Sequence, residues 1–71
     1  MGCVVTYIAL GEDGSHSNPM SALCKNEKTG RTIIADMVAK HENDPLYMDV
    51  GYRMTLSRDG NVIFEESRGA Q

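Results

Sequence analysis

Two cysteines and two histidines are the residues of this chain whose side chains could most readily bind a metal or act as nucleophiles. Structural zinc sites use Cys and His donors, usually in pairs with about two to four residues between them. Cys3, His16, Cys24 and His41 each stand alone in the sequence, so we expect no metal and no other cofactor. The lack of a CxxC motif favours reduced thiols, as in cytoplasmic proteins, and a Cys3–Cys24 disulfide is the alternative.

A nucleophile needs a neighbouring base, and the chain offers only isolated combinations for one. Cys24 could act with His16 or His41, and Ser15 and Ser17 flank His16 in the sequence. No G-x-S-x-G motif, P-loop or G-x-G-x-x-G motif is present to hold a nucleophile or a phosphate in a defined turn. A chain of 71 residues also has little room for a concave pocket, so we do not expect an enzyme.

The first residues match a short acylation motif, M-G-x-x-x-[ST], formed by Gly2 and Thr6 after Met1. Cys3, beside Gly2, is where a second, palmitoyl chain would be attached. The same residues begin an apolar segment that is typical of a strand, and no basic cluster follows closely. We therefore expect no membrane partner, and no run approaches the ~18 apolar residues of a membrane span.

One basic cluster and one polar loop are the candidate sites for an anion or a small ligand. Lys25, Lys28 and Arg31 form the basic cluster, and Gly11–Asn18 is a polar segment with two glycines. The net charge of −3 argues against a nucleic-acid partner, because phosphate binding needs a basic face. Two alternative functions follow: a small-ligand or anion-binding protein that uses Gly11–Asn18, and a nucleic-acid-associated accessory protein that uses the basic cluster.

The composition indicates a folded soluble domain rather than a disordered chain. Apolar residues make up 41% of the sequence and charged residues 24%. We expect a single small domain, residues 1–71, in the cytoplasm. A chain this short buries only about 60% of the surface that it exposes when unfolded, so its core should be thin.

Cys3–Leu10 is predicted to be a strand, since it is rich in β-branched and aromatic residues. Residues on both of its faces are apolar: Cys3, Val5, Tyr7 and Ala9 on one face, and Val4, Ile8 and Leu10 on the other. Such a strand is usually central in its sheet and covered on both sides.

Pro19–Lys28 allows two interpretations. Asn18 and Pro19 resemble an N-cap and a first helical position, with Gly30 just past the end, and this favours a short helix. In the alternative, Met20–Lys25 is a strand that turns through residues 28–30 into a second strand, Arg31–Ile34.

Arg31–Glu42 is predicted to be an amphipathic helix. Its stripe recurs with the 3.6-residue helical period and comprises Ile33, Ile34, Met37, Val38 and His41. The sequence Asn43-Asp44-Pro45 should end this helix, because the residue before a proline disfavours the helical conformation.

The C-terminal third is predicted to be a hairpin. Every even position from Leu46 to Leu56 is apolar, which is typical of a strand with one buried face, and we expect this strand to span Leu46–Ser57. A three-residue loop, Arg58-Asp59-Gly60, with Gly60 in the left-handed conformation should precede the return strand, Asn61–Glu66. In the resulting register the facing pairs are Leu56 with Val62, Met54 with Phe64 and Arg53 with Glu65.

These elements predict an α+β fold: one small domain in which an antiparallel sheet, made of the N-terminal strand and a long C-terminal hairpin, packs against one or two helices. No catalytic set, ligand set or basic face stands out in the sequence. The predicted function is therefore a non-enzymatic protein-interaction module, a small regulator or inhibitor that binds a partner protein.

Self-association is also predicted. The return strand is too short to pair with the first half of the long strand, so Leu46–Gly51 should keep an unpaired apolar edge. A homodimer could cover this edge together with the second apolar face of Cys3–Leu10. The residues expected near the interface are Met48, Val50, Cys3, Val5 and Tyr7.

Overall fold

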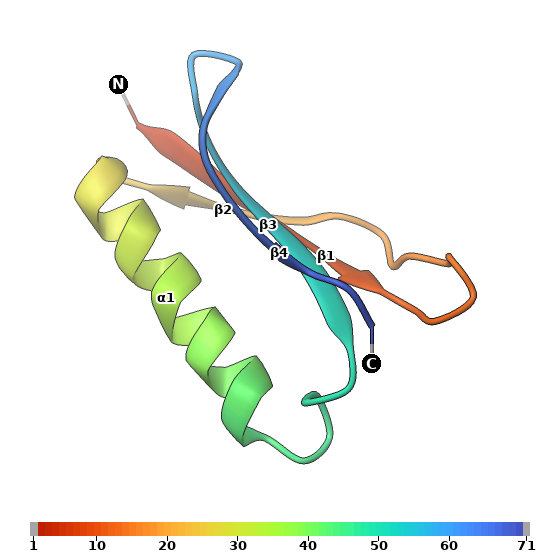
Figure 1. Cartoon of the computed structure of the whole chain (residues 1–71). Helices are drawn as coiled ribbons and strands as arrows, with labels where there is room; N and C mark the ends of the chain where they lie inside the picture. Colours follow the sequence, from red (N-terminus) through yellow and green to blue (C-terminus); the bar gives the residue numbers. More distant parts are fainter. Residues whose placement is uncertain (1, 71) are drawn as a thin grey trace.

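Five regular elements follow one another along the chain, and the computed structural model describes residues 2–70. In chain order they are β1 (Cys3–Leu10), β2 (Met20–Cys24), α1 (Glu27–Asn43), β3 (Gly51–Arg58) and β4 (Asn61–Arg68). The strands form one antiparallel sheet in the order β2-β1-β3-β4 (Figure 1). The predicted α+β fold is confirmed, and so are the predicted bounds and the central position of β1.

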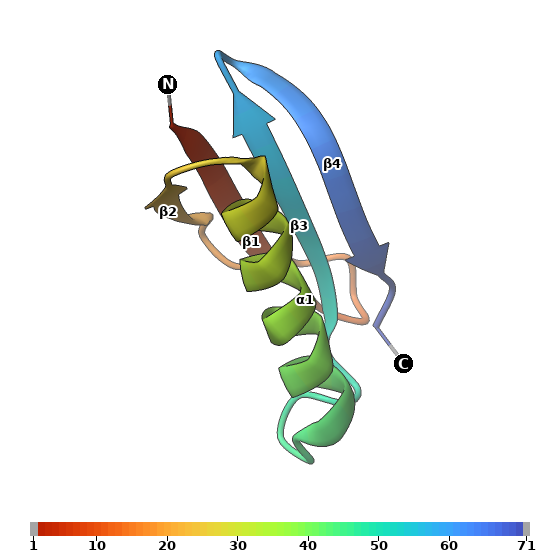
Figure 2. The same cartoon turned by 90° about the vertical axis from the view of Figure 1, so that its left-hand side faces the viewer.

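The molecule has two layers, because α1 lies along one face of the sheet (Figure 2). The helix contacts β1, β2 and β3. Within residues 2–70 no helix or strand lies on the opposite face of the sheet. Only the loop between β1 and β2 projects on that side, beyond the end of β1 (Figure 1).

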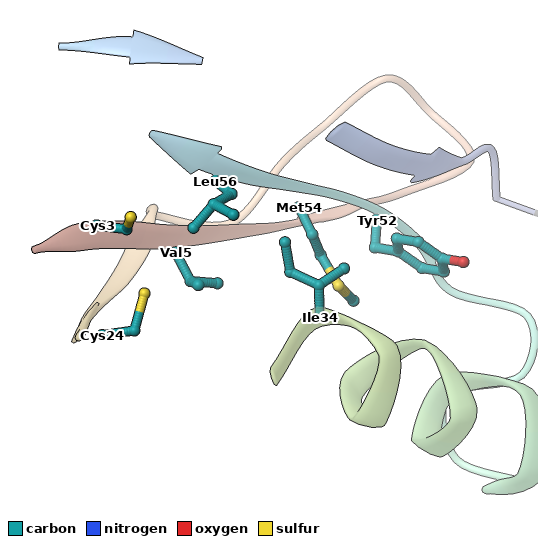
Figure 3. Close-up of a cluster of buried hydrophobic side chains, with 7 residues drawn as sticks. All are labelled: Cys3, Val5, Cys24, Ile34, Tyr52, Met54 and Leu56. Atoms are coloured by element: carbon teal, nitrogen blue, oxygen red, sulfur yellow. The ribbon is translucent and has the colours of Figure 1, made fainter. Parts of the chain in front are cut away.

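Seven buried side chains fill the space between the two layers (Figure 3). They are Cys3, Val5, Cys24, Ile34, Tyr52, Met54 and Leu56. The last three alternate along β3, as the period of two predicts for a strand with one buried face. Ile34 comes from the predicted apolar stripe of the helix and is 1% exposed.

α1 begins earlier than predicted, at Glu27 rather than Arg31. Asn26 is the N-cap, and its side-chain oxygen accepts a hydrogen bond of 2.8 Å from the Thr29 N–H. The carboxylate of Glu27 also accepts a hydrogen bond of 3.0 Å from Arg31, one turn further along the helix. These local contacts stabilise a first turn that the apolar periodicity alone does not reveal.

Gly30 lies inside α1 and does not end a helix, so its predicted role was wrong. A Cβ at this position would meet the side chain of Leu56 and would lie 3.1 Å from the Cys24 sulfur. The glycine therefore allows the first turn of α1 to approach the sheet closely.

The predicted short helix at Pro19–Lys28 was also wrong, because its first half forms β2. The alternative strand is right for Met20–Cys24, but the second strand of that alternative, Arg31–Ile34, lies within α1. Four of the five residues of β2 are exposed, so this segment lacks the alternation of buried and exposed residues that would identify a strand in the sequence. Backbone pairing with β1, from a distant part of the chain, decides the conformation of β2.

Residues 44–50 form a turn, so the predicted strand Leu46–Ser57 is wrong in its first half. The N–H groups of Tyr47 and Met48 donate to the carbonyl of Asp44 at 2.9 and 3.0 Å. The apolar alternation here has no buried face, since Leu46 is 81% exposed. The unpaired edge predicted at Leu46–Gly51 is therefore absent, and self-association needs a different argument.

The turn between β3 and β4 has two residues, Asp59 and Gly60, instead of the predicted three-residue loop. Both have positive φ, 52° and 83°, which is typical of a type I′ hairpin turn. The left-handed conformation predicted for Gly60 is confirmed.

The predicted register of this hairpin was wrong, because the register shifts between Leu56 and Ser57. Ser57 pairs with Val62, whereas Leu56 pairs with Phe64, so Ile63 is the extra residue of a bulge. The predicted pairs are replaced further along the strands as well: Met54 pairs with Glu66, and Arg53 with Ser67. The bulge allows a tight Asp-Gly turn to join the strands while the Phe64 side chain still lies on the α1 side of the sheet.

Candidate functional site

The face of the sheet opposite α1, here called the open face, carries its side chains in rows that cross the strands. Alternation along each strand assigns residues to this face, because their neighbours in sequence are buried under α1. Starting at the β3–β4 turn, the rows are Leu23-Val4-Ser57-Val62, Ser21-Thr6-Thr55-Glu65 and Ile8-Arg53-Ser67, followed by Leu10.

Apolar side chains at both edges of the open face, on β2 and on β4, are accessible to solvent. Leu23 is 84% exposed and Val62 is 59% exposed. Val4, Ile8 and Leu10, on the central strand β1, are half-buried by their neighbours in the sheet. The expectation that β1 is covered on both sides is therefore wrong for this face.

The polar groups of the open face include hydroxyls, which both donate and accept hydrogen bonds, and side chains of both charges. The hydroxyl oxygens of Thr6 and Ser21 lie 3.3 Å apart across β1 and β2. Arg53 and Glu65, on neighbouring strands, are both exposed. A face with hydroxyls, one cation and one anion can be complementary to a second copy of itself.

A second feature is a hollow of about 280 Å³ between the start of β2, the end of α1 and the turn at residues 44–50. Its lining residues are Tyr7, Met20, Met37, Lys40, His41 and Tyr47. Two methionines and two tyrosines make most of this wall apolar. Lys40 adds a cation, with its Nζ 5.7 Å from the centre of the Tyr47 ring.

His41 is the buried polar residue at the base of this hollow, and it is 5% exposed. Its Nε2 lies 2.8 Å from the Tyr7 hydroxyl, while its Nδ1 has no hydrogen-bond partner. The rings of Tyr7, Tyr47 and Tyr52 surround the imidazole, with centroids 5.5, 5.5 and 4.9 Å away. Burial, followed by the neighbouring Tyr47, raises the pKa of the Tyr7 hydroxyl, so this hydroxyl stays protonated at neutral pH.

The predicted ligand loop, Gly11–Asn18, contributes to a third feature, a hollow of about 430 Å³ beyond the end of β1. The loop is fixed by backbone bonds, among them one of 3.0 Å from the Ser17 N–H to the Ala9 carbonyl. The acidic side chains that line the hollow are Glu12 and Asp49. Two carboxylates at one opening do not favour an anion.

The predicted interface residues do not lie on one surface. Cys3 and Val5 point toward α1 and are 0% and 3% exposed, so their side chains already belong to the core. Tyr7 is half-buried and lines the hollow at His41. Met48 and Val50 lie in the turn at residues 44–50, at the far end of the molecule from Cys3.

The predicted basic cluster is only partly free to bind an anion. The Arg31 side chain is paired with Glu27 at 3.0 Å, and its guanidinium carbon lies 4.3 Å from the centre of the Phe64 ring. Lys25 and Lys28 are exposed. Arg31 therefore contributes to the packing of α1 on Phe64 of β4 as well as to the charge of the helix.

The fold brings Cys3 and Cys24 together across β1 and β2, but it separates Cys24 from both histidines. In the described part of the chain, residues 2–70, no three His, Cys, Asp or Glu side chains form a group that could hold a metal ion. Cys24 precedes the first turn of α1 and His41 lies in its last turn, about 20 Å away along the helix. His16 pairs with Leu10, at the opposite end of β1 from Cys24.

The hydroxyl beside His16 is held by the backbone. Ser17 Oγ accepts a hydrogen bond of 3.0 Å from the Ala9 N–H and donates one of 3.2 Å to the Asn18 carbonyl. The Nδ1 of His16 contacts the carbonyl oxygen of Ser17, at 3.1 Å, rather than its hydroxyl. The arrangement therefore does not place an imidazole as a base for the Ser17 hydroxyl.

The acylation motif falls on β1. Gly2 is exposed, whereas the Cys3 sulfur lies in the core and Thr6 contacts Ser21. A palmitoyl chain on Cys3 would require the start of β1 to leave the sheet. Among the described residues no helix is both long and apolar enough to cross a membrane.

Comparisons of the chain with models of known protein families, with curated proteins and with solved structures return no match. The surfaces of the molecule, above all the open face and the hollow at His41, are therefore the basis for its function. The sequence predicts that a second copy covers one apolar face of Cys3–Leu10, but the predicted face, with Cys3 and Val5, packs against α1. The face that α1 leaves uncovered carries Val4, Ile8 and Leu10.

Proposed function

We propose that this chain is a small, non-enzymatic interaction module that acts as a homodimer, with the two open faces packed against each other. The observation that carries the proposal is that no helix or strand in the described part of the chain covers the apolar side chains of the open face, which are Val4, Ile8, Leu10, Leu23 and Val62. A sheet with one apolar uncovered face commonly packs on a second sheet about 10 Å away.

The size of the open face agrees with this proposal. Four strands about 4.8 Å apart, with up to eight residues of about 3.3 Å each, give a face of roughly 400–500 Å². Two such faces approach the ~1,000 Å² that a specific interface generally buries. The dimer should therefore form at micromolar concentration and dissociate on dilution.

Charge and hydrogen bonding favour a second copy as the occupant. Around a two-fold axis, Arg53 of each copy can approach Glu65 of the other, so the same ion pair forms twice in the dimer. The hydroxyls of Ser21, Thr6 and Thr55 can each donate and accept, so the middle row also matches itself. A face with one sign of charge would not have this property.

Light scattering and sedimentation equilibrium at micromolar concentration test the proposal. The expected mass is twice the 7.8 kDa of one chain. Ile8→Lys, at the centre of the open face, should give 7.8 kDa with the helix content unchanged. The matched control is Leu46→Lys, since Leu46 is an apolar residue that is 81% exposed in the distant turn, and it should remain a dimer.

A wild-type mass of 7.8 kDa over the whole concentration range would overturn the homodimer. Dissociation by Leu46→Lys combined with a dimeric Ile8→Lys would place the interface on the other end of the molecule. Either result would contradict the proposed role of the open face.

A second candidate function is the binding of a small apolar acid in the hollow at His41. The buried imidazole with an unpaired Nδ1 is the observation that favours it, together with the Lys40 cation at the opening. Benzoate should shift the amide resonances of residues 37–41 and 47 saturably, whereas benzylamine, its cationic counterpart, should not. Equal shifts with both compounds, or no saturation with benzoate, would contradict this candidate.

A further inference from the structure

Cys3 and Cys24 are direct partners in the antiparallel pairing of β1 with β2. Directly opposite residues of such a pair have Cα atoms about 4.5–5.5 Å apart, which is within the range of about 4.4–6.8 Å that a disulfide spans. Both side chains lie on the α1 side of the sheet, and Figure 3 shows the Cys24 sulfur pointing from β2 toward β1. Both cysteines are free thiols in this structure. Because they are direct cross-strand partners, a bond between them would need little movement of the backbone.

The two thiols have different surroundings. Cys3 lies beside Arg58, whose pKa is raised, first of all through its contact with the Cys3 side chain. The thiolate is the attacking form of cysteine in disulfide exchange. The pKa of Cys24 is raised by burial and then by the proximity of Cys3, so Cys24 is held as a thiol.

Access to this pair depends on β2. Cys3 is 0% exposed and Cys24 is 7% exposed, and the first turn of α1 lies against the Cys24 sulfur at Gly30. β2 is a five-residue edge strand, and its other four residues are exposed. Short edge strands open at a lower free energy than the rest of a fold, and the opening of β2 would uncover both thiols at once.

We propose that Cys3 and Cys24 form a thiol–disulfide couple that exchanges with low-molecular-weight disulfides. In the first step the Cys3 thiolate attacks one sulfur of the small disulfide; its S–S bond breaks, and one small thiolate leaves and takes up a proton. In the second step Cys24 gives up its proton and attacks the Cys3 sulfur, and the second small thiolate leaves. The protein loses two electrons and two protons, and one small disulfide becomes two thiols.

The bond would change the dynamics of one part of the fold. It would join the edge strand β2 to the central strand β1 next to the start of α1. Opening of β2 would then be suppressed, so hydrogen exchange of the β2 amides should slow in the oxidised protein. The open face lies on the other side of the sheet, so this couple goes beyond the proposed dimer and does not depend on it.

Incubation of the full chain in glutathione buffers of increasing oxidised fraction tests the couple. Intact mass should fall by two hydrogen atoms, peptide mapping should join residues 3 and 24, and the mixed disulfide should not accumulate. Cys24→Ser should stop with one glutathione on Cys3.

Retention of both thiols by the wild-type protein in fully oxidised glutathione would overturn the proposal. So would a stable glutathione adduct on the wild-type protein, or a bond between two chains in place of the 3–24 bond. The wild-type measurements alone decide these outcomes, so the proposal stays testable even where the Cys24→Ser variant does not fold.

Discussion

Arg68 connects the end of β4 to the turn that follows α1. Its Nη2 donates hydrogen bonds of 2.9 Å to the carbonyls of Met48 and Val50, and its guanidinium carbon lies 5.2 Å from the centre of the Tyr52 ring. These carbonyls have no strand partner, because residues 44–50 are a turn. The guanidinium therefore satisfies backbone acceptors that a strand would otherwise pair.

Replacement of the Arg68 side chain should destabilise the protein more than is usual for a residue so near a chain end. We expect Arg68→Met to lower the free energy of unfolding by about 1–3 kcal/mol, because methionine keeps most of the packing on Tyr52 but donates no hydrogen bonds. Lys25→Met, which removes an exposed cation, should change it by less than about 0.5 kcal/mol. Equal effects of the two variants in urea melts would contradict this role of Arg68.

The Tyr7–His41 hydrogen bond gives a prediction that depends on pH. Removal of the hydroxyl in Tyr7→Phe leaves both nitrogens of the buried His41 without a partner, and should cost about 1–2 kcal/mol at pH 7. Burial raises the pKa of Tyr7 in the folded protein above its unfolded value of about 10. The stability from the protonated hydroxyl is thus present below about pH 10 and is lost as the pH rises through the folded pKa.

Denaturant melts from pH 7 to 11 check this expectation. The difference between wild type and Tyr7→Phe should be constant up to about pH 9 and should shrink above pH 10. Tyr47→Phe serves as the control at pH 7, since Tyr47 is 39% exposed, and should change the stability by less than about 0.5 kcal/mol. A difference that stays constant up to pH 11 would contradict the assignment.

At the scale of elements, the contact of α1 with the sheet depends on Gly30. A glycine inside an exposed helix usually lowers stability by about 1 kcal/mol relative to alanine. Here a Cβ would meet the Leu56 side chain, which is 0% exposed and cannot move aside freely. Gly30→Ala should therefore destabilise the protein by about 1–3 kcal/mol, although alanine has the higher helix propensity.

A double-mutant cycle separates the two effects. In the background of Leu56→Ala the space for the new methyl group exists, so Gly30→Ala should become neutral or stabilising. Stabilisation by Gly30→Ala in the wild-type background would show that α1 does not approach β3 as closely as described.

The β3–β4 turn gives a second prediction at this scale. Gly60 has a φ of 83°, a conformation that residues with a Cβ adopt only with strain. Gly60→Val should lose about 1–2 kcal/mol of stability in thermal melts. Gly69→Val is the matched control, because Gly69 has open space around it and no positive φ, and its melting temperature should stay close to that of the wild type.

For the whole molecule, dimerisation through the open face should make thermal stability depend on protein concentration. Unfolding of a dimer releases two chains, so the melting temperature rises with concentration. We expect a clear rise across a roughly hundredfold range for wild type and for Leu46→Lys, and no rise for Ile8→Lys. A melting temperature of wild type that does not vary over this range would contradict the proposed dimer independently of the mass measurements.

The sequence by itself determined the features that depend on local pattern. The strand Cys3–Leu10, the helical stripe with Ile34, the buried alternation at the end of the long strand and the left-handed Gly60 all follow from periodicity or turn chemistry. Each of these patterns reflects contacts between near neighbours in the chain or the difference between a buried and an exposed face. They were sufficient for the α+β class.

The tertiary structure alone decided the features that depend on distant partners. β2 is a strand because β1 pairs with it, and residues 44–50 form a turn whose carbonyls bind Arg68. The hairpin register depends on a bulge that places Phe64 under α1. One helix can cover only one face of a sheet, and the packing of α1 on Cys3 and Val5 left Val4, Ile8 and Leu10 on the open face.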